Sequence, residues 1–321
     1  MYYTDKQICV GMGKQRIMKI YHSIEEYAKT GYESHVALGF FDGVHLGHRA
    51  VIESAVRDKG ECRAVVLTFD DSPARYLGND VALITDNAEK AQRIEALGAD
   101  AVIFADFGRL KDTDAEDFVR EVLKKKLRAK KVSCGFDYRF GKNGRGDTRL
   151  LKEIGDQIGI EVEIKEPVYC GEQAVSSSAI RALLKSGRIE EADRMLGYPY
   201  RIGGVIGDGN HIGTKMGFPT VNLPMKKGMV VPRFGVYASL ISVGGMRYRG
   251  ATNIGVHPTV GENSEPLCET FILDFGGEDL YGKYAECTPI AFVREEMKFN
   301  SLDALTMQVK KDIETIKRIL E

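Results

Sequence analysis

The sequence lacks closely spaced cysteine pairs, long apolar runs and an excess of charge of either sign. Its six cysteines are scattered without a Cys-x-x-Cys pair, which favours reduced thiols in a cytoplasmic protein over a disulfide framework or a zinc site. No apolar run approaches the roughly 20 residues that a membrane-spanning helix needs. The formal net charge of −1 provides no basic field for nucleic acid or an anionic membrane. We therefore expect neither nucleic acid nor a membrane as a partner.

The length and composition of the chain indicate two ordinary globular domains. With 321 residues, the chain is long enough for each of two domains to bury its own core. Its hydrophobic content of 43% and charged content of 28% are typical of globular proteins. Residues 1–17 lack the charged-then-apolar order of a secretory signal. A first strand is predicted to open at Met18, and we expect the residues before it to be an extension or a mis-assigned start.

The stretch 18–187 alternates between strand-like and helix-like segments. Strands are predicted at Val36–Phe41, Arg63–Phe69, Asp100–Phe104, Lys131–Cys134 and Glu161–Val168. Helices are predicted between them at Leu46–Asp58, Asn87–Leu97, Asp114–Leu127 and Arg149–Ile158. This alternation predicts an α/β doubly wound parallel sheet, with ligands at the carboxyl ends of its strands.

The pattern changes after a short helix predicted at Arg188–Leu196. Short β-rich runs separated by glycines follow, at Gly235–Val243, Arg247–Asn253, Glu269–Leu273 and Ala285–Val293. They predict a small antiparallel β-barrel. Apolar residues at helical spacing within 301–321 predict a C-terminal helix packed on that barrel. We therefore place the domain boundary near 187–199 and predict domains at 18–186 and 187–321.

Segment 39–51 carries the most functional information, and it reads Gly-Phe-Phe-Asp-Gly-Val-His-Leu-Gly-His-Arg-Ala-Val. A buried strand is predicted to stop at its Asp-Gly turn pair, and a helix follows. His45 and His48 then lie on one face at the helix start, beside unpaired backbone N–H groups and the positive end of the helix dipole. Such a site suits nucleotide phosphates. Two surface histidines on an ordinary strand–turn–helix are the alternative.

Two later segments add polar groups to the same predicted domain. The loop Phe136–Lys142 follows a strand and carries basic side chains suited to phosphates, although a solvated turn has the same composition. Val175–Arg181 reads as a serine cap that opens a helix and places Arg181 about one turn in. A plain helix start would explain these serines equally well.

A glycine-rich segment, 203–223, contains the run Gly-Phe-Pro-Thr-Val-Asn in the predicted C-terminal domain. Thr220 and Asn222 alternate along an extended strand, so both side chains point to one face. Neutral oxygens there suit Mg²⁺ that keeps waters and bridges nucleotide phosphates. No Walker-type Gly-Lys-Ser/Thr motif occurs, which excludes a P-loop kinase. Taken alone, this segment is more typical of a glycine-rich hairpin than of a metal site.

Together, these motifs resemble those of a known enzyme family. Segment 39–51 is similar to the Gly-x-Phe-Asp-Gly-x-His-x-Gly-His signature of bacterial bifunctional riboflavin kinase/FAD synthetases. Segments 136–142 and 175–181 resemble two further motifs of their adenylyltransferase half, and 217–222 resembles the riboflavin kinase signature Gly-Phe-Pro-Thr-x-Asn. The resemblance runs from about Met18 to the last residue. It implies phosphorylation of riboflavin to FMN in the barrel domain and adenylylation of FMN to FAD, with release of pyrophosphate, in the N-terminal domain.

The resemblance also implies roles for individual residues. Catalytic roles are implied for His45, His48, Arg181 and, as general base, Glu269, for which an exposed strand carboxylate is the alternative. ATP contacts are implied for Gly39, Phe41, Asp42, Gly47, Ser177, Ser178, Gly213, Lys215, Gly217 and Pro219. Flavin contacts are implied for Asp137, Arg139, Phe140, Arg294 and Phe299, and metal contacts for Thr220 and Asn222. The expected cofactor is Mg²⁺ with ATP, and the expected small-molecule partners are riboflavin, FMN, FAD and ATP.

The sequence departs from the family pattern at three places. Asp71 and Ser72 stand where the family has proline and histidine in Thr-Phe-x-Pro-His-Pro, which puts one ATP contact in question. Ser178 replaces a threonine but keeps the hydroxyl, and Lys215 stands where the family often has arginine. Two alternative functions are considered, the first of them because of Asp71 and Ser72. One is an enzyme that retains only the kinase activity, and the other is a flavin-responsive binding protein without turnover.

Overall fold

The computed structural model describes residues 17–76, 78–79, 81–207, 220–256, 265–276 and 280–321. The chain forms two compact units that are each built from several stretches of sequence. The first unit comprises Met1–Phe40, Ala50–Asp71 and Ala91–Lys165, and the second comprises Phe41–Arg49, Ser72–Lys90 and Glu166–Glu321. The histidine-containing turn therefore belongs to the second unit. The functional boundary near 187–199 stays a prediction.

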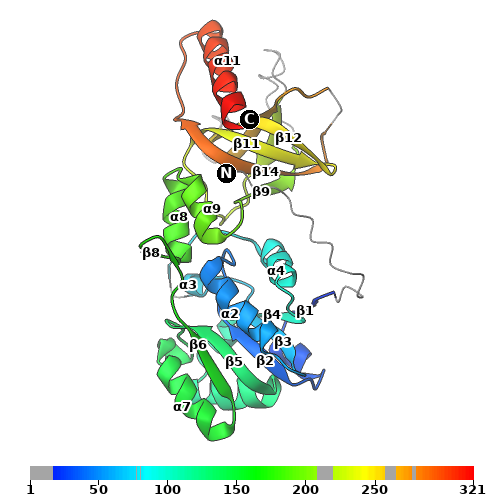
Figure 1. Cartoon of the computed structure of the whole chain (residues 1–321), viewed down its shortest axis with the longest axis vertical. Helices are drawn as coiled ribbons and strands as arrows, with labels where there is room; N and C mark the ends of the chain where they lie inside the picture. Colours follow the sequence, from blue (N-terminus) through cyan, green and yellow to red (C-terminus); the bar gives the residue numbers. More distant parts are fainter. Residues whose placement is uncertain (1–16, 77, 80, 208–219, 257–264, 277–279) are drawn as a thin grey trace. The chain divides into compact units, whose positions relative to one another are not determined.

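The first unit contains a parallel six-stranded sheet with the order β1-β4-β3-β2-β5-β6 (Figure 1). Its strands are β1 (Lys19–Tyr21), β2 (Ser34–Leu38), β3 (Arg63–Phe69), β4 (Ala101–Ala105), β5 (Ala129–Gly135) and β6 (Glu161–Lys165). Every residue of β2 and β4 is buried, as expected for strands covered on both faces. The strand order changes direction between β2 and β5, which confirms the predicted doubly wound fold.

Most strand ends differ from the predictions by a few residues, and two of the differences have a local physical reason. The strand predicted to reach Phe41 ends at Leu38, because Phe41 has φ 55° and belongs to the following turn. The strand predicted to reach Val168 ends at Lys165, two residues before Pro167, which has no N–H for a strand ladder.

The helices linked to this sheet are mostly those that the sequence predicts. They are α1 (Ile24–Ala28), α2 (Leu46–Arg57), α4 (Asn87–Ala96), α5 (Phe107–Leu110), α6 (Ala115–Asp117), α7 (Thr148–Ile158) and the short 3₁₀ turn Lys142–Gly144. The helix predicted at Asp114–Leu127 is one α-helical turn followed by a π-helix, Phe118–Lys126. Its wider register is closed by the Leu127 N–H, which donates to the Val122 carbonyl.

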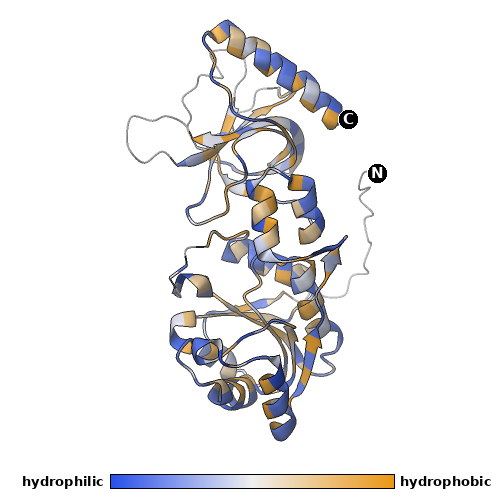
Figure 2. Cartoon of the chain, turned by 90° about the vertical axis from the view of Figure 1, so that its left-hand side faces the viewer, coloured by the Kyte–Doolittle hydropathy of each residue, from blue (hydrophilic) through white to orange (hydrophobic). Residues whose placement is uncertain are grey.

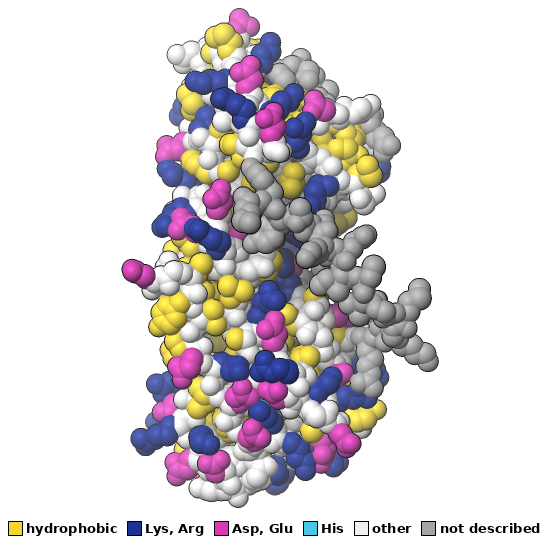
Figure 3. Space-filling model, viewed as in Figure 1, with side chains coloured by type: hydrophobic (Ala, Val, Ile, Leu, Met, Phe, Trp, Pro, Cys, Tyr) yellow, Lys and Arg dark blue, Asp and Glu magenta, His cyan; other side chains and the backbone are white. Residues whose placement is uncertain are grey.

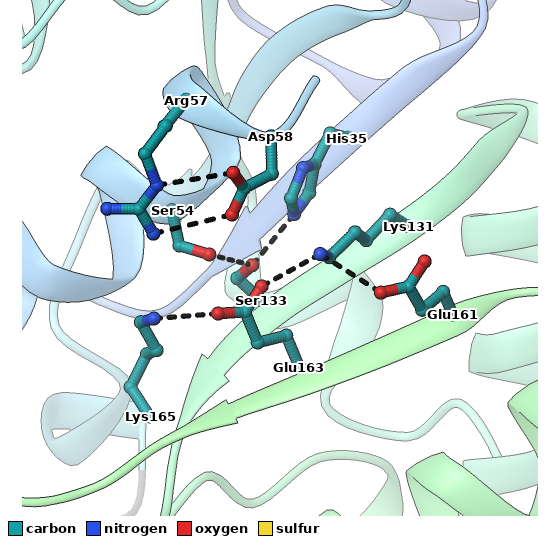
Figure 4. A network of polar contacts seen from close by, with 9 residues as sticks. All are labelled: His35, Ser54, Arg57, Asp58, Lys131, Ser133, Glu161, Glu163 and Lys165. Atoms are coloured by element: carbon teal, nitrogen blue, oxygen red, sulfur yellow. Dashed lines mark hydrogen bonds and ion pairs between the residues drawn. The ribbon is translucent and has the colours of Figure 1, made fainter. Parts of the chain in front are cut away.

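A buried polar network joins α2, β2 and β5 inside the first unit (Figure 4). The His35 ring is fully buried, and its Nε2 lies 2.7 Å from Ser133 Oγ. Ser133 Oγ is in turn 3.1 Å from Ser54 Oγ of α2. Burial lowers the pKa of His35, so the ring is neutral near pH 7. The hydrogen bonds between these three neutral side chains fix α2 against the sheet, and Figure 4 shows ion pairs of Lys131 and Lys165 with Glu163 beside them.

The second unit contains a six-stranded antiparallel sheet with the order β10-β13-β12-β11-β14-β9. Its strands are β9 (Ile202–Val205), β10 (Thr220–Pro224), β11 (Gly235–Val243), β12 (Met246–Val256), β13 (Pro266–Ile272) and β14 (Tyr284–Arg294). The Gly207 N–H donates to the Asn222 carbonyl at 3.0 Å and links the two outer strands. This nearly closed sheet confirms the predicted small barrel.

Helices and a hairpin complete the second unit. They are α3 (Pro73–Tyr76), α8 (Ser177–Lys185), α9 (Ile189–Leu196), α11 (Leu302–Ile319) and the hairpin β7 (Tyr169–Cys170)–β8 (Gln173–Ala174). Figure 2 shows hydrophilic and hydrophobic residues alternating along α11, next to the C-terminus, as in an amphipathic helix. Ile316 is fully buried against Val236, Ala238 and Leu273 of the barrel, which confirms the predicted helix packing.

Charged side chains of both signs are interspersed over the described surface in Figure 3. No extended field of one sign covers the described part of that face, in keeping with the net charge of −1. Other charged side chains form specific ion pairs within the second unit. Arg294 at the end of β14 donates from Nε and Nη2 to Asp312 Oδ2 of α11, at 2.9 and 2.7 Å.

We predict that Asp312→Ala destabilises the second unit. The two side chains are only 18% and 7% exposed, so the change leaves the Arg294 guanidinium nearly buried without its carboxylate. Loss of one partner of a buried pair costs about 3–5 kcal/mol of unfolding free energy. Urea unfolding followed by circular dichroism measures this. The matched control is Glu314→Ala on the exposed side of α11, which should cost less than about 0.5 kcal/mol. Equal losses in both variants would refute the anchoring role.

Candidate functional site

A strained turn lies between β2 and α2. Phe41, Gly43 and Val44 have φ of 55°, 81° and 36°, and both non-glycine residues are about 1% exposed. Positive φ is costly for a bulky or β-branched residue and persists only where the surroundings impose it. A Cβ on Gly43 would also lie 3.1–3.3 Å from side-chain atoms of Ile84. Only glycine therefore suits position 43, and the turn depends on external contacts for its shape.

The carboxylate of Asp42 provides the central contact of this turn. It is 2% exposed, and its Oδ1 accepts hydrogen bonds from the backbone N–H groups of Ile84 at 2.8 Å and Thr85 at 3.3 Å. Its Oδ2 accepts from Arg181 Nη1 at 2.7 Å. Burial raises the pKa of Asp42, while these hydrogen bonds and the guanidinium oppose the rise. Both carboxylate oxygens are therefore used to hold protein groups in place.

The serine-capped helix α8 supplies further partners, as the sequence predicts. Ser176 caps the helix, and its Oγ accepts from the Ala179 N–H at 3.2 Å. Ser177 Oγ donates to the Asp42 carbonyl at 2.9 Å. Arg181 Nη2 donates to Ser178 Oγ at 3.2 Å. The structure thus brings together four of the predicted site residues, Asp42, Ser177, Ser178 and Arg181.

The two histidines stack on each other at the start of α2. His45 precedes the helix and caps it, because its Nδ1 accepts from the His48 N–H at 3.3 Å. Their ring centroids are 3.5 Å apart at an interplanar angle of 17°. The Phe41 ring meets His48 edge-on at 5.3 Å. His48 Nδ1 is buried and has no hydrogen-bond partner among the described residues, so one acceptor or donor of this site is left for another group.

Both histidines are neutral at physiological pH. Burial lowers the pKa of His45 to about 4. Burial also lowers the pKa of His48 well below its usual value, with contributions from His45 and Lys90. Each neutral ring still donates one N–H. The pair therefore supplies hydrogen bonds without positive charge.

The glycines of the segment have different surroundings. Gly39 follows β2 in the first unit, and its N–H donates to the Leu67 carbonyl at 3.3 Å. Gly47 lies under the His45 ring, since an added Cβ would be 3.2 Å from His45 Cε1. The resemblance implies an ATP contact for Gly47, and the structure shows in addition that a side chain at this position would crowd the His45 ring.

The predicted flavin residues of the N-terminal half lie in the loop after β5, within the first unit. Asp137 and Arg139 are exposed. Phe140 is 6% exposed, and its ring centroid is 5.5 Å from that of Phe118. A Cβ on Gly146 would approach the Phe140 ring to 2.7 Å, so the loop closes tightly on this side chain. Phe140 therefore anchors the loop in the core, and a flavin contact by this residue stays a prediction.

A second polar cluster lies across three barrel strands. Asn222 of β10 pairs in register with Glu269 of β13, which pairs in turn with Asn253 of β12. Residues directly opposite in an antiparallel sheet share a face. Thr220, two residues before Asn222, donates from Oγ1 to Glu269 Oε1 at 2.6 Å. The structure thus gathers Thr220, Asn222 and Glu269, and adds Asn253.

The remaining predicted residues are placed as follows. Gly213, Lys215, Gly217 and Pro219 lie outside the described residues. Arg294 is bound to Asp312, and its Cζ lies 6.0 Å from the Phe299 ring centroid. Within the described residues, no group of three or more His, Cys, Asp or Glu side chains is arranged to hold a metal ion.

Sequence reasoning missed three residues near the strained turn. Thr85 Oγ1 accepts from the Gly43 N–H at 3.0 Å. Lys90 of α4 is 1% exposed and lowers the pKa of both Asp42 and His48, which places its charge beside them. The Tyr198 hydroxyl donates to the Gly43 carbonyl at 2.5 Å. Of the three, only Lys90 could have been noticed in the sequence, because it lies on the same predicted helix face as the apolar residues Ala91 and Ile94.

Comparisons with known proteins give a consistent result. The family model described as FAD synthetase matches residues 28–179, and the model described as riboflavin kinase matches residues 196–320. The bifunctional riboflavin kinase/FMN adenylyltransferase of Listeria monocytogenes is 36% identical over 299 residues, covering 91% of this chain and 94% of its own. The Bacillus subtilis protein of the same name is 35% identical over 298 residues, covering 90% and 92%.

A solved structure matches the whole fold. A crystal structure from Streptococcus pneumoniae, described as a macrolide-efflux protein, has a TM-score of 0.84 and 30% identity, and covers 94% of this chain and 99% of its own. That description applies to the Streptococcus protein. In the part of this chain that the structure describes, no helix is both long and apolar enough to span a membrane.

We predict that acid destabilises the protein through His45. Its pKa is about 4 when folded and about 6.5 when unfolded, so the unfolded state binds more protons between these values. Stability is therefore lost as pH falls through this window, by about 2 kcal/mol between pH 7 and pH 5. His45→Asn keeps a capping oxygen but cannot titrate. Urea unfolding at both pH values should show the additional loss only in the wild type, and parallel losses in both proteins would contradict it.

Proposed function

Since the chain belongs to the family of bifunctional riboflavin kinase/FMN adenylyltransferases, we propose that it makes FAD from riboflavin in two ATP-dependent steps. Riboflavin and ATP give FMN and ADP, and FMN and a second ATP give FAD and pyrophosphate. The observation that carries the proposal is that the chain contains two assembled clusters of polar side chains, one mostly within the FAD synthetase match and the other within the riboflavin kinase match. One cluster surrounds Asp42 and the stacked histidines, and the other surrounds Glu269.

Adenylyl transfer is the step proposed for the first cluster. A phosphate oxygen of FMN attacks the α-phosphorus of ATP, and the bond to pyrophosphate breaks. The chemistry needs alignment and stabilisation of charge on the phosphates rather than a covalent intermediate with the protein. The neutral rings of His45 and His48 donate hydrogen bonds to phosphate oxygens, and Arg181 supplies positive charge. The unpartnered Nδ1 of His48 supports a ligand contact at this ring.

The remaining residues of this cluster have supporting roles in the proposal. Ser177, Ser178 and Arg181 hold the leaving pyrophosphate, while Phe41 and Gly47 shape the ATP pocket. Gly39 remains a proposed ATP contact. Asp42 was expected to contact ATP directly. Because both of its oxygens are occupied by Ile84, Thr85 and Arg181, we propose that it orients Arg181 and the turn instead. Asp137 and Arg139 remain proposed flavin contacts, with exposed side chains available for FMN.

Phosphoryl transfer is the step proposed for the second cluster. The ribityl hydroxyl of riboflavin attacks the γ-phosphorus of ATP, its proton passes to Glu269, and ADP leaves. The hydrogen bond from Thr220 to Glu269 at 2.6 Å fixes the carboxylate and supports this role. Arg294 and Phe299 remain proposed flavin residues, with Arg294 oriented by Asp312.

Mg²⁺ is proposed to enter this second cluster with ATP. The hydroxyl of Thr220, the amide of Asn222 and the carboxylate of Glu269 share one face and provide oxygens, which are the ligands that Mg²⁺ prefers. Thr220 and Asn222 would hold the ion, which would neutralise charge on the nucleotide phosphates. Because both steps consume ATP, we also propose that the protein acts in the cytoplasm.

The deciding experiment is incubation of the purified full-length protein with riboflavin, ATP and Mg²⁺, followed by chromatographic separation of flavins. The proposal expects FMN first and FAD later. FMN without FAD would support the kinase-only alternative raised by Asp71 and Ser72. No product, despite riboflavin binding, would support a flavin-responsive binding protein.

We predict that Glu269→Gln and His48→Ala separate the two steps. Glu269→Gln keeps the shape and the bond from Thr220 but removes the base, so riboflavin phosphorylation should slow by roughly 10²–10⁴-fold. His48→Ala removes a preorganised donor, so adenylyl transfer to FMN should slow on the order of 10²–10³-fold. Each variant serves as the folding control for the other, because the unaffected step should keep its wild-type rate. Loss of both activities in either variant would argue against separate sites.

A further inference from the structure

The strained turn at Phe41–Val44 is held by three segments that are distant in sequence but belong to the same compact unit. The first segment is 84–85, whose backbone amides donate to Asp42. The second is α8, through Ser177 and Arg181. The third is Tyr198, whose hydroxyl donates to the Gly43 carbonyl at 2.5 Å. Because the turn has positive φ at three residues, its shape depends on these contacts.

The Tyr198 contact comes from the stretch that matches riboflavin kinase. The FAD synthetase match ends at residue 179, and the riboflavin kinase match begins at residue 196. Gly197 ends α9 with φ 78°, and a Cβ there would lie 2.5 Å from Leu46 Cδ2 at the start of α2. The chain therefore passes closely over the first residue of the histidine helix before Tyr198 reaches the turn.

A second connection reaches the turn by way of the segment around Leu83. The Leu83 N–H donates to the Gly228 carbonyl at 2.8 Å, and the Val230 N–H donates to the Leu83 carbonyl at 2.7 Å. Lys226 forms an ion pair with Asp86 on the same segment. Residues 84 and 85, which hold Asp42, are thus paired through their neighbours to the stretch that matches riboflavin kinase.

We propose that Tyr198 is a positioning residue for adenylyl transfer, so that the stretch matching riboflavin kinase completes the other reaction's site. The proposal rests on the function proposed above. The Gly43 carbonyl is buried, and without the phenol it loses its donor and the turn loses one of three tethers. His45 and His48 follow that turn directly, so its relaxation moves both rings away from the phosphates that they are proposed to bind.

The kinetic test is Tyr198→Phe, which keeps the ring and removes only the donor. One neutral hydrogen bond is worth about 0.5–1.5 kcal/mol, so turnover of FMN to FAD at saturating ATP should fall roughly 2- to 12-fold. Riboflavin phosphorylation should keep its wild-type rate. The matched control is Tyr237→Phe, because Tyr237 OH donates to the Arg233 carbonyl at 2.5 Å in the same unit. Equal losses of FAD synthesis in both variants would overturn the proposal.

A double-mutant cycle separates positioning from general destabilisation. If Tyr198 acts through the histidine turn, Tyr198→Phe should cost less than about twofold in a His48→Ala background, because coupled residues are not additive. The same fold-loss in both backgrounds would show that Tyr198 acts independently of His48, and would overturn the proposal.

A titration tests the positioning without relying on turnover. Proton NMR of the histidine rings should show the pKa of His45 rising from about 4 toward 6.5 in Tyr198→Phe, because a looser turn hydrates the ring. Tyr237→Phe should leave the titration unchanged. An unchanged titration in Tyr198→Phe would overturn the positioning role. Absence of FAD from the wild-type reaction would instead overturn the proposed adenylyl transfer, so the two failures are distinguishable.

Discussion

The buried carboxylate of Asp42 is the contact on which the arrangement of the first cluster depends. An ionised carboxylate at 2% exposure requires compensation by donors or opposite charge. Two backbone amides and the Arg181 guanidinium provide it, and they come from segments separated by about a hundred residues. The same contacts impose the positive φ of Phe41 and Val44, and so direct the chain into α2 with His45 at its cap. One buried charge thus links the backbone shape to the placement of both histidines.

In this cluster, hydrogen-bond donors and positive charges are supplied by different residues. Burial lowers the pKa of His45 and His48, so the stacked rings contribute directional donors without charge. Positive charge is supplied separately by Arg181, which is paired, and by Lys90, which is buried nearby. Fixed donors in a low-dielectric site stabilise developing negative charge with little reorganisation. This arrangement suits phosphate chemistry over a wide pH range, since neither histidine titrates near pH 7.

Regular elements could be predicted from sequence, whereas long-range tethers could not. The predicted strand at Arg63–Phe69 matches β3, and that at Gly235–Val243 matches β11, because apolar runs bounded by turn residues specify strands locally. The serine cap before α8 was also readable from local chemistry. Phe41 was wrongly assigned to a strand, because it continues an apolar run. Its positive φ depends on contacts with distant segments, which the local sequence does not reveal. Tyr198 gave no signal for the same reason, as its acceptor lies 155 residues away.

The two clusters differ in what holds them, and this predicts how each tolerates change. Thr220, Asn222 and Glu269 are aligned by the pairing of adjacent strands β10 and β13, so backbone register alone places them. The histidine turn instead depends on side-chain tethers from three segments and on strained backbone. Substitutions outside the second cluster leave strand register intact in most positions, whereas loss of a single tether relaxes the turn. Adenylyl transfer is therefore the step that depends more on residues far from its substrates, and the departures at Asp71 and Ser72 fall in that more dependent half of the protein.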